Sequence, residues 1–321
     1  MAEKGKKTIR LAAVQASPVL LDKTATTQKV CALIIEAGQH GADVIGFPET
    51  FIAGYPGWVE IIPVRAEPAK SLYRRLFAQA VEMPGPETSA IGAACEKAGI
   101  YAVVGINERR SYTTGTLWNT NLFFGRDGTL LHKHRKFTPT VGERLIHAPG
   151  DTGSKTSVRA EFGTISSLIC GENGNPLAQY SIALEYPIVH VASWPPHHNQ
   201  GQNVEKTVQV FSAAVATSVG CYVINSIAVM DENAISAYAL DEESRKFLQD
   251  VPSKRQASIV GPGGTVLADA QCTAKDGSED IIYADVNTED LVAVKYAVDF
   301  AGHYNRPEVF AHHFRPFLVK E

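Results

Sequence analysis

The chain has 321 residues, of which 45% are hydrophobic and 20% are charged, and its formal net charge at pH 7 is −4. This composition is typical of a globular protein with a sizeable core, and the small negative charge without a long basic block argues against nucleic acid as a partner. No apolar run approaches the ~20 residues that a membrane-spanning helix needs. Gln15 interrupts the short apolar stretch near the start, so we predict no signal peptide.

The cysteines are an odd number, spread along the chain without a C-x-x-C pair: Cys31, Cys95, Cys170, Cys221 and Cys272. Such spacing argues against a disulfide framework and against a zinc ribbon. It favours a reducing cytoplasm, in which one cysteine can act as a nucleophile.

In chain order, the first part of the sequence alternates between buried strands and amphipathic helices. Val30, Leu33, Ile34 and Ala37, for example, recur at helical spacing within residues 24–38. The predicted strands are residues 8–16, 42–49 and 101–107, the predicted helices are 24–38, 68–81 and 87–98, and residues 118–134 form a hairpin that turns at 125–128.

The second part continues in the same way. The predicted strands are residues 161–170, 187–194, 221–229 and 281–286, the helices are 175–186 and 204–215, and residues 258–269 form a hairpin. Residues 231–256 are polar and charged and predict a surface insertion. Alternating strand–helix units mixed with hairpins indicate an α/β protein with mixed sheets that are covered on both faces. No linker divides the chain, so we expect a single domain over residues 1–321.

Three reactive side chains lie at or just beyond the ends of predicted strands: Glu49, Lys136 and Cys170. Sites in α/β proteins gather at strand ends, so we expect the Cys170 thiol to be exposed at this strand-to-helix turn, near backbone N–H groups that stabilise a thiolate. Each residue alone also fits a structural role, as a buried thiol, a helix cap or a solvated lysine. Together they supply a nucleophile, a base and a cation.

The segments around these residues resemble the Glu–Lys–Cys signature of the nitrilase, or carbon–nitrogen hydrolase, superfamily. "GFPETFIAGYP" resembles the glutamate segment, "HRKFTPTVGER" the lysine segment, and "ICGEN" the cysteine segment. "DFAGHYNRPEVF" resembles a segment that is typical of true nitrilases rather than of amidases. The resemblance extends from Ile9 to about Phe310.

The resemblance implies a four-layer α-β-β-α sandwich with two mixed β-sheets. It also implies that Cys170 is the nucleophile, Glu49 the general base and Lys136 the cation that stabilises developing charge. Glu143 matches a second family glutamate, which would orient Lys136 or water. No metal and no organic cofactor are implied.

A substrate pocket is expected around Tyr55, Gly171, Glu172 and Trp194. The family usually has Trp directly after the cysteine, where this chain has Gly171. A glycine removes a large side chain and allows close approach of the backbone, so the departure bears on the pocket rather than on the reaction.

The reaction implied is the hydrolysis of an organic nitrile by two waters to a carboxylic acid and ammonia, through a thioimidate and a thioester. The alternatives with the same site are an amidase and a cyanide hydratase. From other classes, a non-catalytic scaffold and a redox sensor at Cys170 stay open. His132 and His134 are two apart on a strand, as in some zinc sites, but without a third ligand they read as polar residues near the site entrance.

The domain is expected to have its core at about residues 8–300 and an interface segment at about 301–321. The resemblance implies a homo-oligomer, either a dimer or a larger spiral assembly. The other partners are the nitrile substrate and water, with neither nucleic acid nor a membrane.

Overall fold

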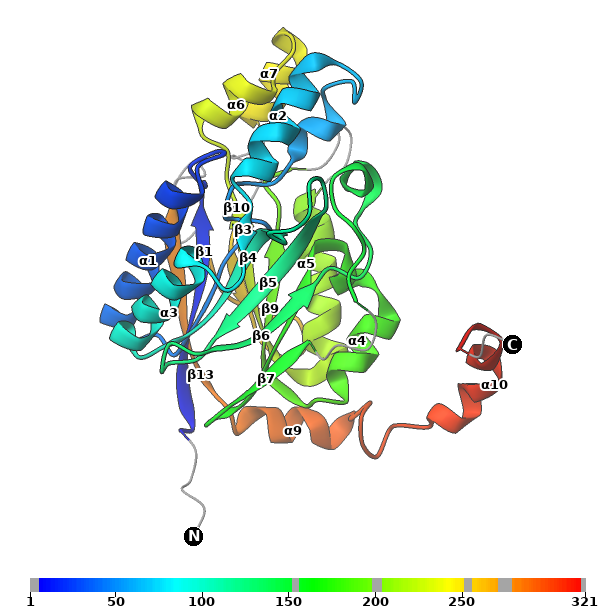
Figure 1. Cartoon of the computed structure of the whole chain (residues 1–321). Coiled ribbons are helices and arrows are strands. Elements are labelled where there is room, and N and C mark those ends of the chain that lie inside the picture. Colours follow the sequence, from blue (N-terminus) through cyan, green and yellow to red (C-terminus); the bar gives the residue numbers. More distant parts are fainter. Residues whose placement is uncertain (1–5, 152–155, 198–203, 251–255, 271–278, 319–321) are drawn as a thin grey trace.

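The structure is a computed structural model that describes residues 6–151, 156–197, 204–250, 256–270 and 279–318. Cys272 and residues 251–255 of the predicted insertion lie outside the described residues. Figure 1 shows two layers of strands between two layers of helices, as the family resemblance implies. Within the described part of the chain, no helix is both long enough and apolar enough to cross a membrane.

The first sheet is built from strands of the first half of the chain and one late strand. Its order is β6–β5–β4–β2–β1–β13, and the short β3 pairs with the end of β4. β1, β2 and β4 are parallel, whereas β1–β13, β4–β5 and β5–β6 are antiparallel pairs. The strands are β1 (Thr8–Ala16), β2 (Val44–Gly46), β3 (Val81–Glu82), β4 (Tyr101–Arg109), β5 (Leu117–Phe124), β6 (Leu130–Arg135) and β13 (Asp280–Asn287).

The second sheet has the order β7–β8–β9–β10–β11–β12 and is also mixed, because only β8, β9 and β10 are parallel. Its strands are β7 (Ser157–Ala160), β8 (Gly163–Ile169), β9 (Pro187–Trp194), β10 (Tyr222–Ala228), β11 (Ser258–Val260) and β12 (Val266–Asp269). The prediction of two mixed sheets is confirmed. The sequence pattern did not predict that the ends of β1 and β10 pair in parallel, which links the sheets.

The two sheets pack face to face over an apolar core. Leu11 and Val103 of the first sheet and Val191 and Ile224 of the second belong to one buried cluster. Gly46 shows how close the packing is, because a Cβ there would lie 2.8 Å from Val191 Cγ1 across the interface. A larger residue at this point would force the sheets apart.

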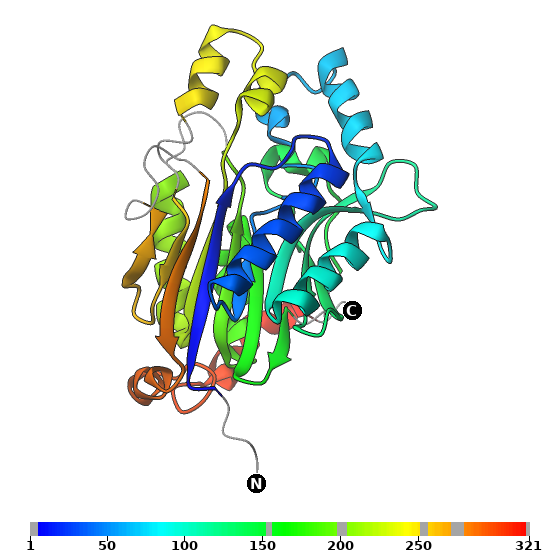
Figure 2. The ribbon, with the colours of Figure 1, turned by 90° about the vertical axis from the view of Figure 1, so that its left-hand side faces the viewer.

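Helices cover both outer faces of the sandwich. Figure 2 shows α1 and α3 across the first sheet, and Figure 1 shows α4 and α5 on the opposite side. Sequence signals set their ends: the Asp22 side chain accepts a hydrogen bond from the backbone N–H of Ala25, and Gly99 ends α3 with φ +67°. These helices are α1 (Lys23–Gln39), α3 (Pro86–Ala98), α4 (Pro176–Ala183) and α5 (Val204–Val215), which continues into the π-helical turn η4 (Ala216–Gly220).

The predicted surface insertion at residues 231–256 is only partly correct. It forms α6 (Glu232–Tyr238) and α7 (Glu242–Asp250), and these pack with α2 (Glu67–Ala78) and the turn η1 (Gly57–Glu60) at one end of the molecule. Tyr238 is fully buried there, with its ring centroid 5.6 Å from that of Trp58. The segment therefore has an apolar face that its polar composition concealed.

Two C-terminal helices were not predicted from the sequence. They are α9 (Asp290–Ala297) and α10 (Pro307–Leu318). α9 lies below the sheets, and α10 extends away from the sandwich (Figure 1).

Candidate active site

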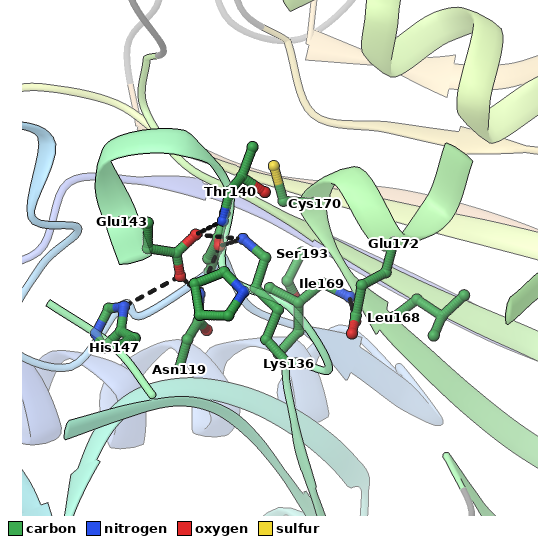
Figure 3. Close-up of polar contacts among 12 residues, drawn as sticks. Asn119, Lys136, Thr140, Glu143, His147, Leu168, Ile169, Cys170, Glu172 and Ser193 are labelled. Carbon is green, nitrogen blue, oxygen red and sulfur yellow. Dashed lines mark hydrogen bonds and ion pairs between the residues drawn. The ribbon is translucent and has the colours of Figure 1, made fainter. Parts of the chain in front are cut away.

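The ends of three strands bring the predicted side chains together. Glu49 follows β2, Lys136 directly follows β6, and Cys170 begins the turn η3 (Cys170–Gly174) at the end of β8. Thus the acid and the lysine come from the first sheet and the thiol from the second. Figure 3 shows Cys170 and Thr140 beside the contact between Lys136 and Glu143.

Lys136 is enclosed between two carboxylates. Its ammonium lies 2.6 Å from Glu49 Oε1 and 2.6 Å from Glu143 Oε2. All three side chains are at most 1% exposed. Burial alone would lower the pKa of Lys136, but Glu49 and Glu143 outweigh it and raise that pKa well above its usual value, so the lysine stays charged.

Both carboxylate oxygens of Glu143 accept hydrogen bonds. Its Oε2 accepts from Lys136 and from the backbone N–H of Thr140, and its Oε1 accepts from Asn119 and lies 3.0 Å from His147 Nδ1. Burial acts to raise the pKa of Glu143, but Lys136, His147 and Asn119 together lower it below its usual range. Glu143 is therefore a permanent carboxylate at neutral pH.

Glu49 has a different environment. Its Oε1 accepts from Lys136 and, at 2.6 Å, from Asn119, whereas its Oε2 is buried without a hydrogen-bond partner among the described residues. Burial raises the pKa of Glu49 to about 7, against the effect of Lys136 and with a further contribution from Glu143. This carboxyl group can therefore exchange a proton near neutral pH.

The Cys170 thiol is buried, not exposed as its place at the end of a strand predicted; only 2% of the residue is accessible. Burial, and after it the charge of Glu49, raise the pKa of Cys170 well above its usual value, although Lys136 lowers it. The protonation of the thiol therefore depends on the charges of Glu49 and Lys136. The backbone of Cys170 has φ +51°, a left-handed conformation that non-glycine residues adopt where the surroundings enforce it.

Glu172 holds the turn that carries Cys170. One carboxylate oxygen accepts from the backbone N–H of Ile169 at 2.8 Å and lies 2.8 Å from His134 Nε2, and the other accepts from the backbone N–H of Phe137 at 2.6 Å. His134 is fully buried, so its placement near the site entrance was wrong. Glu172 was predicted to bind substrate. Its carboxylate instead accepts from backbone N–H groups of the residues next to Cys170 and next to Lys136.

The other predicted pocket residues lie around the same turn. Tyr55 is buried, and burial, followed by the charges of Glu143 and Glu49, raises its pKa well above the usual value. Gly171 is exposed, and a Cβ there would meet only Thr140 Oγ1, at 3.5 Å. The Trp194 indole lies in the buried cluster that includes Cys170 and donates to Asn225 Oδ1. The contribution of each to substrate binding stays a prediction.

Asn119, Thr140 and His147 contact Glu143, but the sequence analysis did not select them. Asn119 and Asn121 lie two apart on a buried strand, "LWNTNLFF", whose other residues except Thr120 are apolar, and two amides on one face of such a strand indicate a polar site. Among the described residues, no group of three or more His, Cys, Asp or Glu side chains could hold a metal ion.

The model of the family described as carbon–nitrogen hydrolase matches residues 10–296. The chain belongs to this family. A prokaryotic protein named nitrilase 3 is 34% identical over 95% of this chain and 89% of its own length, and a nitrilase of Paraburkholderia phymatum is 33% identical over 95% of this chain and 86% of its own. The crystal structure of a carbon–nitrogen hydrolase from Helicobacter pylori matches with a TM-score of 0.71 at 16% identity over 98% of this chain and 99% of the other. That likeness confirms the family fold.

Proposed function

We propose that this carbon–nitrogen hydrolase is a nitrilase, which converts an organic nitrile and two waters into a carboxylic acid and ammonia. The observation that carries the proposal is a buried thiol beside a carboxylate with one unpaired oxygen and a pKa of about 7. The relatives named nitrilase, which match over most of the chain, support the nitrile as substrate.

In the proposed first step, Cys170 is the nucleophile and Glu49 the base. An ordinary thiol has a pKa of ~8.5 and an ordinary glutamate ~4.3, a gap of ~4 units that opposes proton transfer. Burial raises both pKa values in this site, so above a pH of about 7 the resting state holds a thiol and a carboxylate. The proton therefore moves to Glu49 as sulfur attacks the nitrile carbon, and then to the nitrile nitrogen, which gives a thioimidate.

Lys136 is proposed to stabilise the charge that develops on the substrate. An ammonium group has three hydrogens, and two of them point to Glu49 and Glu143. The third is available to the nitrile nitrogen and later to the oxygen of the tetrahedral intermediate, together with the backbone N–H of Gly171.

The later steps use the same groups. Glu49 takes a proton from the water that adds to the thioimidate and passes it to the nitrogen, which gives a tetrahedral carbon bearing a hydroxyl and an amino group. The hydroxyl proton then moves through Glu49 to the amino group, the C–N bond breaks, and ammonia leaves a thioester behind. A second water then hydrolyses the thioester, which releases the acid and restores the thiol. Expulsion of the thiolate instead of ammonia would release an amide, as a cyanide hydratase does, and an amidase would begin from the amide.

Product analysis tests the proposal. The purified protein is incubated with aliphatic, aryl and arylacetonitriles and with the matching amides, and acid, amide and ammonia are quantified. Acid and ammonia from a nitrile are expected, and Cys170→Ala should remove them without unfolding the protein. Cys95→Ala, which removes a thiol on the buried face of α3, should retain activity. Turnover of amides alone would replace the nitrilase with an amidase, and full activity of Cys170→Ala would refute the nucleophile.

We also propose that the protein forms a homo-oligomer and is located in the cytoplasm. α9 and α10 expose apolar side chains, among them Val292 at 72% and Tyr296 at 86%, which is typical of a surface that binds another copy of the chain. A homo-oligomer formed through this segment is therefore proposed. A thiol nucleophile also requires reducing conditions, which favours the cytoplasm.

A further inference from the structure

His147 lies at the inner end of the site and has no assigned role. It follows the turn η2 (Val141–Leu145), which carries Glu143 four residues earlier, and its side chain is fully buried. The two ring nitrogens face two different oxygens. Nδ1 lies 3.0 Å from Glu143 Oε1, and Nε2 lies 2.8 Å from Asn107 Oδ1. Figure 3 shows the contact with Glu143.

Asn107 can present only its oxygen to the imidazole. Its amide nitrogen donates to the backbone carbonyls of Ile52 at 3.1 Å and Gly54 at 3.0 Å, with that of Thr50 at 3.5 Å. Turning the amide over would set Oδ1 against these carbonyl oxygens. The hydrogen bond to Asn107 Oδ1 must therefore come from a hydrogen on His147 Nε2.

Glu143 also presents only an acceptor. Its carboxylate already receives hydrogen bonds from Lys136, Asn119 and the backbone of Thr140, and these donors keep it ionised. The contact with Glu143 Oε1 therefore needs a second hydrogen, on His147 Nδ1. A neutral imidazole would leave a lone pair against one of the two oxygens in a buried place, where an unpaired polar contact is costly.

A charged imidazole also balances the charges of the site. Lys136 contacts both Glu49 and Glu143, His147 contacts Glu143, and all four side chains are at most 1% exposed, so a charged His147 gives two cations for two carboxylates. On the Asn107 side the described partners are uncharged backbone carbonyls. The neighbouring acid on β4, Glu108, is bonded to Arg135, Lys133 and Thr120 instead.

We propose that His147 is a positioning residue for nitrile hydrolysis: a doubly protonated imidazolium, anchored on Asn107, that fixes the Glu143 carboxylate and thereby Lys136. The inference rests on the proposed function for its kinetic part only. With His147 bonded to Oε1, Glu143 turns Oε2 toward Lys136. Because charged His147 also neutralises Glu143, Lys136 can interact with Glu49 and the substrate as well as with Glu143.

The protonation state is tested without substrate. In the full-length protein with 15N-labelled histidine rings, magic-angle-spinning NMR at pH 7.5 should show both nitrogens of His147 bonded to hydrogen. The signal is assigned by its loss in His147→Gln or, if that chain does not fold, by its shift in Asn107→Ser. One nitrogen without hydrogen in the wild-type protein would overturn the proposal.

Kinetics test the positioning role. His147→Gln keeps a donor but removes the charge, so kcat should fall about 10- to 100-fold with little change in KM, as expected when a reacting group is misplaced. Loss of a nearby cation makes ionised Glu49 less stable, so the acid limb of kcat/KM should move upward by about one pH unit. The exposed His40→Gln is the control.

The two proposals fail in different ways. An unmoved acid limb in a folded His147→Gln protein that still hydrolyses nitrile would overturn the role of His147 and leave the nitrilase intact. Absence of nitrile turnover by the wild-type protein would refute the proposed function, while the NMR result would still decide the protonation of His147.

Discussion

Two glutamates contact the same lysine, yet their surroundings give them different properties. Glu143 receives donors at both oxygens and is a permanent carboxylate, whereas Glu49 has one oxygen without a partner among the described residues and a pKa of about 7. Pairs of acids whose environments separate their pKa values commonly divide the work of a site. On this basis Glu49 transfers protons, and Glu143 fixes the lysine.

Glu49→Gln should remove the base while it preserves the shape of the side chain. We expect kcat to fall by about 10²- to 10⁴-fold, the usual contribution of a general base. In the wild-type protein kcat/KM should rise with pH through about 7, because the deprotonated form of Glu49 is the active one. The measurement is a pH profile of nitrile turnover for both proteins. An acid limb that persists unchanged in the residual activity of Glu49→Gln would assign it to another group.

At the scale of elements, the sequence predicted most of the sandwich because its strands are apolar and its helices have clear ends. β1 coincides with the predicted residues 8–16, and α3 begins at Pro86, one residue before its predicted start, and ends before Gly99 as expected. The strand-end positions of Glu49, Lys136 and Cys170 were also readable, because strand ends meet in such folds.

The parts that were missed depend on tertiary contacts. α6 and α7 are polar overall, and Tyr238 becomes a core residue only because it packs on Trp58 and donates to the carbonyl of Tyr55. The thiol of Cys170 was expected to be exposed, since nothing local reveals that it belongs to a buried cluster with Trp194, against which Phe137 packs. His147 lies four residues after Glu143, a spacing that places two side chains on one face of a helical turn, but its partner Asn107 lies 40 residues away.

Glu172 joins the end of β8 to the segment that follows β6, and its replacement should disturb both. Glu172→Gln would set an amide N–H₂ group against a backbone N–H of either Ile169 or Phe137. We expect the free energy of unfolding to fall by about 1–3 kcal/mol, the cost of an unsatisfied buried group, and kcat to fall with the displaced turn. Urea unfolding and nitrile turnover measure the two effects. Glu96→Gln, a change at an exposed residue of α3, is the control. Equal stability of the two variants would contradict the role of Glu172 in joining the two segments.

For the whole molecule, the site depends on the packing of one sheet against the other. Glu49 and Lys136 belong to the first sheet and Cys170 to the second, while the Glu49 N–H donates to the carbonyl of Trp194 at the end of β9. The buried cluster between the sheets, the short pairing of β1 with β10, and hydrogen bonds from one sheet to the other, such as that from Asn121 to Ser167 Oγ, keep these groups in register. A close-packed interior transmits small displacements, so changes at this interface should alter activity before they unfold the protein.

The last helix offers a test of assembly that is separate from the test of chemistry. The described side chains of α10, residues 307–316, are all exposed, and Val309, Phe310 and Phe314 give it an apolar face. The preceding segment is anchored to the sandwich, since the Tyr180 hydroxyl donates to Asn305 Oδ1. Truncation after Arg306 should therefore leave the unfolding temperature of the protomer within about 2 °C, as expected for loss of exposed residues only.

The same truncation should reduce the oligomer size if α10 binds a second copy of the chain. An exposed apolar helix gains stability by covering that face, and its removal takes away the contact without altering Glu49, Lys136 or Cys170. Light scattering after size exclusion measures the mass, and turnover per protomer measures the site. Phe310→Ser with Phe314→Ser is the matched variant, because it keeps the length and removes the apolar face. An unchanged mass in both variants would remove α10 from the interface and direct attention to α9, where Tyr296 is 86% exposed.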